Sequence, residues 1–112
     1  MTPLKIVETS PGKLSLLLDV GSTKVEAAIA EHGHEGNGYF WEGIAQLLVA
    51  TEAHALEGRF AYDPEASMFC AYGTDRAALE ELGALMADVA NRPDRLAELM
   101  RKAEETEFEF DD

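Results

Sequence analysis

Residues 60–89 read FAYDPEASMFCAYGTDRAALEELGALMADV and decide the fold, because two strand patterns and a helix pattern follow one another there. Residues 59–63 and 68–72 are rich in sheet-forming aromatic side chains, and residues 64–67, which begin with Pro64, connect them. Asp75 or Thr74 can cap the helix that follows. Its apolar residues recur at intervals of three and four: Ala78, Leu79, Leu82, Leu85, Met86 and Val89. The stretch therefore predicts a hairpin followed by a helix.

The first half of the chain has a similar plan. Residues 4–9 fit a short edge strand, and residues 14–20 fit a strand with alternating apolar positions. Residues 21–23 have the length of a hairpin turn, so we expect a partner strand at 24–31 with Val25, Ala27 and Ile29 pointing inward. A glycine-rich loop at 32–38 then leads to a helix at about 40–56, which Gly58 would end.

Pro93 suits the first turn of a last helix, whose apolar stripe includes Leu96, Leu99, Met100 and Ala103. The order β-β-α-β-β-α-α predicts an α+β fold: an antiparallel sheet of two hairpins with helices packed on one face. The 112 residues suffice for one domain, 1–112, which ends in an acidic tail at 104–112. That tail is either a solvated end or part of a partner surface.

The charge balance limits the possible partners. The chain holds 22 acidic and 9 basic residues, for a formal net charge of −13. Nucleic acids and anionic membranes attract basic surfaces, so neither is an expected partner. A basic protein is the favoured one, although surface acids also serve solubility alone. No apolar run is long enough to span a membrane, and the single Cys70 fits a buried thiol in a reduced, cytoplasmic compartment.

Three consecutive aromatic residues, Tyr39, Phe40 and Trp41, begin the first long helix. Successive helical residues are about 100° apart, so they cannot all face inward. We expect Trp41 in the core and at least one of the three exposed. Tyrosine and tryptophan are frequent anchors of protein interfaces.

No nucleophile elbow, P-loop or dinucleotide fingerprint occurs, and 22 acids make no particular carboxylate pair stand out. Residues 18–26 resemble the first phosphate loop of sugar kinases over about ten residues only, and a plain hairpin turn is the favoured interpretation. We therefore expect a protein that is not an enzyme and has no cofactor or metal. Two alternatives stay open. One is a small acidic housekeeping interaction module or assembly subunit. The other is a small enzyme or metal protein that uses His32, His34 and Asp63.

Two blocks together resemble the immunity protein 51 family of bacterial polymorphic-toxin systems. Residues 31–45 read EHGHEGNGYFWEGIA, a glycine-rich stretch that ends in an aromatic residue and Trp-Glu. Residues 60–75 read FAYDPEASMFCAYGTD and carry Asp-Pro-Glu-Ala and Met-Phe-Cys-Ala-Tyr. The resemblance covers about residues 14–100. Phe40 stands where the family pattern has an acid, and Ser67 where it has glycine.

The resemblance implies a cytoplasmic immunity protein that binds a cognate toxin and neutralises it by stoichiometric occlusion, as a monomer or homodimer. The acidic charge adds the hypothesis that the toxin is basic, with a nuclease as one candidate. We expect the toxin-binding surface to draw on these residues: Tyr39, Glu42, Asp63, Glu65, Glu107, Glu109 and Asp111.

Overall fold

A computed structural model describes residues 1–112. The strands are β1 (Lys5–Ser10), β2 (Lys13–Asp19), β3 (Ala61–Tyr62) and β4 (Met68–Gly73). The helices are α1 (Glu26–Glu31), α2 (Gly38–Thr51), the short 3-10 helix η1 (His54–Leu56), α3 (Arg76–Asn91) and α4 (Pro93–Glu105). None of the helices combines the length and the apolar character that crossing a bilayer requires.

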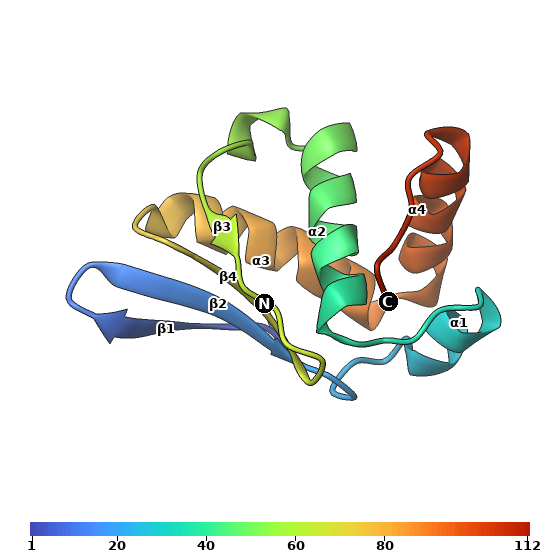
Figure 1. The fold of residues 1–112 in the computed structure, drawn as a ribbon, viewed down its shortest axis with the longest axis horizontal. Helices are drawn as coiled ribbons and strands as arrows, with labels where there is room; N and C mark the ends of the chain where they lie inside the picture. The colour runs from blue at the N-terminus through green and yellow to red at the C-terminus, as the bar shows by residue number, and fades with distance from the viewer.

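The four strands form one antiparallel sheet in the order β1-β2-β4-β3, which confirms the predicted α+β class of two hairpins. The helices lie on one face of this sheet, with α2 and α3 against it and α4 packed on the helices (Figure 1). Side chains alternate along β2, where Leu14, Leu16 and Leu18 are buried under the helices. The other face of the sheet is uncovered.

The strand predicted at 24–31 is wrong, because this segment contains helix α1. Val25 and Ile29 are each 1% exposed, while Ala27 points to solvent. Residues four apart share one face of a helix as well as of a strand, and alanine is the strongest helix former. The Thr23 hydroxyl also accepts from the Val25 amide at 3.3 Å and donates to the Glu26 carboxylate. The first hairpin therefore pairs β2 with β1, the predicted edge strand.

The helix predicted at 40–56 is shorter, since α2 ends at Thr51 and η1 follows. The Glu52 carboxylate is held by Arg95 and Lys102 of α4, which places Glu52 outside the apolar stripe. Gly58, with φ +78°, follows η1 instead of ending α2. The strand predicted at 59–63 is likewise reduced to the two residues of β3.

The structure confirms the predicted cap at Asp75, the predicted place of Pro93 and the burial of Trp41. The Asp75 carboxylate caps α3 by accepting from the Ala78 amide at 3.1 Å, and Pro93 stands in the first turn of α4. Trp41 and Phe40 are fully buried, and Tyr39 is the exposed member of the aromatic triplet, at 39%. Cys70 is only half-buried, because it points to the uncovered face of the sheet and not into the core.

Residues 107–112, which we call the strap, turn back after α4 and run between α2 and α4 (Figure 1). Glu107 takes a left-handed conformation, with φ 56°, and reverses the chain. The Phe108 amide donates to the Ala103 carbonyl at 2.9 Å, and the Glu107 amide donates to the Glu104 carbonyl at 3.3 Å. These two bonds form a Schellman turn, so the acidic tail is folded onto the domain.

Gly38, the first residue of α2, lies directly on the turn between β3 and β4. Its amide donates to the Ala66 carbonyl at 3.2 Å, and the Asn37 side chain caps the helix by accepting from the Phe40 amide at 2.9 Å. A Cβ at Gly38 would lie 2.8 Å from the Met68 carbonyl carbon and deep inside the Glu65 carbonyl oxygen. The approach is therefore open to glycine alone.

The substitution Gly38→Ala tests this contact. Alanine normally stabilises a helix relative to glycine, but the clash here is with backbone that cannot move alone. We expect a loss of about 2–4 kcal/mol in the free energy of unfolding, measured by urea denaturation.

Gly83→Ala is the matched control inside α3, because its Cβ meets mainly the flexible end of Met1. It should cost much less than Gly38→Ala. Equal stability of the two variants would contradict the close approach at Gly38.

Candidate functional site

Five acidic side chains gather where the start of α2, the β3 edge and the end of the strap meet. We call this surface the acidic edge; its members are Glu42 and Glu57, which act on Tyr62, Asp111, which acts on Glu42, and Asp63 and Glu65 of the adjoining β3–β4 turn. The contact of Gly38 with the β3–β4 turn holds the first turns of α2 beside Asp63 and Glu65. Tyr39, the next residue along α2, lies exposed at the same place.

Neighbouring carboxylates contribute to the raised pKa values of Tyr62 and Glu42. Burial, together with the nearby carboxylates of Glu42 and Glu57, raises the pKa of the Tyr62 hydroxyl to about 12. Partial burial also raises the pKa of Glu42, with a contribution from Asp111. The surface is therefore strongly negative, and a cation placed on it would relieve this repulsion.

The acids of this surface have no internal partners. None of Glu42, Glu57, Asp63, Glu65 and Asp111 forms an ion pair or a side-chain hydrogen bond within the chain. Four of the nine bases, Arg59, Arg92, Arg95 and Lys102, pair with other acids. Arg95 contacts Glu52, Asp88 and Glu98. Arg59 is held by Asp75 at 2.8 Å. The negative charge of the edge is thus left available to another molecule.

The strap forms one wall of the site. Phe110 stacks on Phe40 with ring centroids 4.9 Å apart and fills the notch at Gly43, where a Cβ would lie 2.5 Å from its ring. Asp112 accepts from the Glu35 amide at 2.7 Å and contacts His34 Nδ1 at 2.9 Å. The alternation of Phe108 and Phe110 with acids therefore puts the rings against the domain and the carboxylates of Glu107, Glu109 and Asp111 outside.

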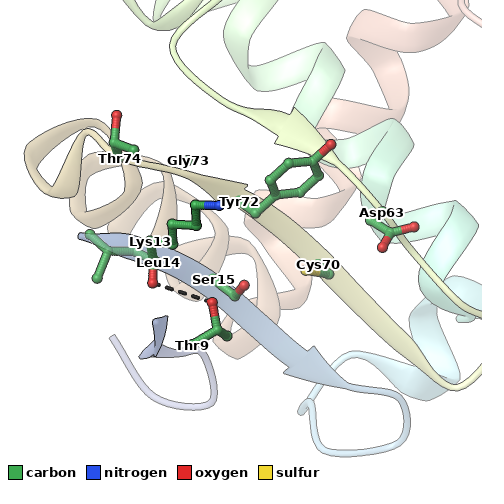
Figure 2. Close-up of a pocket in the computed structure, with 9 residues that line it drawn as sticks. All are labelled: Thr9, Lys13, Leu14, Ser15, Asp63, Cys70, Tyr72, Gly73 and Thr74. Atoms are coloured by element: carbon green, nitrogen blue, oxygen red, sulfur yellow. Dashed lines mark hydrogen bonds between the residues drawn. The ribbon is translucent and has the colours of Figure 1, made fainter. Parts of the chain in front are cut away.

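The uncovered face of the sheet offers a second, different surface. A hollow of about 410 Å³ lies over β2 and β4, where Figure 2 shows Ser15 and Cys70 on its floor and Tyr72 standing above it. Tyr72 is 47% exposed. Burial raises the pKa of the Cys70 thiol, and the charges of Asp63 and Glu65 raise it too, while a hydrogen bond with Ser15 lowers it. The thiol is therefore protonated at neutral pH and a poor nucleophile.

This sheet face also carries Lys5 and Lys13, which project to the same side as Leu17 and Ser15. The sheet face therefore carries both signs of charge, because Asp63 of the acidic edge also borders the hollow beside Lys13. The side of the edge that faces α2 carries the carboxylates of Glu42 and Glu57.

The structure brings together five of the residues predicted for partner binding: Tyr39, Glu42, Asp63, Glu65 and Asp111. Glu107 and Glu109 lie farther along the strap, beside Leu47 and Thr51 of α2. Sequence reasoning missed Glu57 and Tyr62, because only the folded sheet places the loop before β3 beside Glu42.

His34 and Asp63, two residues of the alternative enzyme or metal site, lie in different parts of the structure. His34 packs against Phe110 and Phe40 and binds Asp112, while Asp63 borders the hollow on the sheet face. No group of three or more His, Cys, Asp or Glu side chains lies close enough together to hold a metal ion.

The chain thus folds into a small α+β domain, and the carboxylates of its acidic edge form no ion pair within the chain. Residues 4–105 match the family model of Immunity protein 51. The chain therefore belongs to the immunity protein 51 family, which implies an immunity role and a toxin partner. No curated protein and no solved structure gives a significant match.

Asp112→Asn tests the strap. Burial raises the pKa of Asp112, but its bonds with the Glu35 amide and His34 outweigh this and leave the pKa below its ordinary value. A carboxylate with a lowered folded-state pKa stabilises the fold above its unfolded pKa, and this stabilisation is lost as the pH falls through the folded value. We expect Asp112→Asn to speed hydrogen exchange of the Glu35 amide at pH 7 and to have little effect near pH 2.

Asp111→Asn removes the same charge from a neighbouring side chain that has no hydrogen-bond partner, so it is the matched control. Equal exchange rates in the two variants at pH 7 would show that Asp112 does not fasten the strap.

Proposed function

We propose that this protein is a cytoplasmic immunity protein that neutralises a basic toxin of a bacterial polymorphic-toxin system, and that it docks through the acidic edge. The observation that carries the proposal is that unpaired carboxylates lie close enough to add to the effect of burial in raising the pKa of Glu42 and Tyr62, beside the exposed ring of Tyr39. Membership of the immunity protein 51 family supports a toxin as the partner.

The geometry supports occlusion as the mechanism. Tyr39 is an exposed aromatic anchor beside the charges, and the buried Phe40 and Trp41 hold it in place from below. A toxin that acts on nucleic acid needs a basic substrate groove, and a rigid acidic surface can occupy such a groove in place of the phosphates. A nuclease is therefore the toxin class we favour. The complex would be one-to-one, with no nucleic acid, membrane or cofactor involved.

Charge neutralisation of the edge tests the proposal against the toxin encoded beside the gene. Opposite charges around an interface accelerate association, and this acceleration is screened by salt. The triple variant Glu42→Gln, Asp63→Asn, Glu65→Gln should lower the association rate about tenfold at low salt and flatten its salt dependence, as measured by stopped-flow fluorescence. Cells that express the toxin should also lose protection.

The matched control is the triple variant Glu31→Gln, Glu80→Gln, Glu81→Gln, which makes the same change in net charge on exposed helical positions away from the edge. It should associate nearly as fast as the wild type. If both triple variants slow equally, net charge and not the acidic edge guides the toxin. If the wild type neither binds nor protects, the proposed function is wrong.

The pH dependence of binding gives an independent test. The pKa of free Glu42 is raised by partial burial and by Asp111, so this group takes up a proton more readily than an ordinary glutamate. A bound cation favours the ionised form. Affinity should therefore increase as the pH rises through the pKa of Glu42 and decrease below it. Titration calorimetry at several pH values should show this change of affinity with pH in the wild type and a smaller change in Glu42→Gln. If the two proteins change equally, Glu42 does not contact the toxin.

A further inference from the structure

An apolar groove adjoins the acidic edge, between the second half of α2, η1 and β3. It has a volume of about 400 Å³. Apolar side chains from four segments of the chain line it: Val49, Leu56, Phe60, Tyr62 and Phe108. The edge-to-face contact between the Phe60 and Tyr62 rings, with centroids 5.7 Å apart, makes one wall rigid.

The groove carries charge of one sign only. Glu57 is its single charged lining residue, and the charge of Glu42 acts on the hydroxyl of Tyr62, which also lines the groove. The basic residue nearest in sequence, Arg59, is turned away and held by Asp75 at 2.8 Å. An apolar occupant would fill the space but leave these carboxylates without a counter-charge.

Arginine combines the two properties that the groove requires. Its three-carbon stem can lie on aliphatic side chains, and its planar guanidinium can stack on an aromatic ring while it donates to a carboxylate. The lysine ammonium is more strongly hydrated and lacks the planar shape, so it gains less from such a site.

We infer, on the basis of the proposed function, that this groove receives one arginine side chain of the toxin, with the stem along Val49, the guanidinium on the Phe60–Tyr62 wall, and Glu57 as its ion-pair partner. This arginine would be the energetic anchor of the complex, while the acidic edge sets the rate of association.

Ala50→Arg tests the inference, because Ala50 is exposed at the border of the groove and an arginine there can fill it from within the chain. Ala84→Arg is the matched control, an exposed position of α3 with the same change in size and charge. Thermal unfolding first establishes that both variants are folded. Relative to Ala84→Arg, the variant Ala50→Arg should weaken toxin binding about tenfold or more.

A small-molecule probe tests the groove without the toxin. N-acetyl-arginine methylamide, titrated into the wild-type protein, should shift the amide resonances of Ala50, Gly58 and Phe60. The lysine and glutamate analogues should shift them less, and Glu57→Gln should reduce the response to the arginine compound.

The outcomes separate the two proposals. If the wild type protects cells but Ala50→Arg binds the toxin as tightly as Ala84→Arg, the groove inference falls and the immunity function stands. An arginine probe that shifts these resonances no more than the glutamate analogue also overturns the inference. If the wild type does not bind the toxin, the proposed function is wrong, and the inferred binding of a toxin arginine in the groove is wrong as well.

Discussion

The close approach of Gly38 to the turn between β3 and β4 is the contact on which the functional surface depends. Only a residue without a Cβ can lie against the Glu65 and Met68 carbonyls, and the Asn37 cap fixes the direction in which α2 then leaves. This contact joins the two sequence blocks that resemble the immunity protein 51 family. It therefore sets Tyr39 and Glu42 on α2 beside the acids of the hairpin, although more than twenty residues separate them in sequence.

The structure shows which charged residues pair with one another and which do not, and the composition alone cannot show this. Arg95 and Lys102 of α4 pair with Glu52 at the end of α2, and Arg95 also pairs with Asp88 of α3, so these ion pairs tie α4 to both helices. The five acids of the edge take part in none of these ion pairs. A net charge of −13 would serve solubility wherever it lay. The edge differs from the rest of the acidic surface in having an exposed aromatic residue and an apolar groove beside its carboxylates.

Sequence reasoning predicted the parts of the fold that local signals determine. Asp75, Pro93 and the stripe of α3 are such signals, because caps and apolar spacing act within a few residues. It failed at 24–31, where Val25 and Ile29 fit a strand and a helix equally, and the neighbouring strand was supplied by residues 5–10. The sequence did not predict the folded strap or the place of Glu57 in the site. Both depend on residues that only the fold brings together: Phe110 with Gly43, and Glu42 and Glu57 with Tyr62.

The central claim is that the toxin docks on the acidic edge and not on the uncovered sheet face. Hydrogen exchange of the protein with and without its toxin, resolved by residue, tests this most directly. We expect slower exchange on binding at residues 57–66 and in the strap, with β1 and the β1–β2 turn unchanged. Slower exchange confined to β1, β2 and the neighbourhood of Tyr72 would contradict it, and would place the partner over the hollow between Lys13 and Cys70.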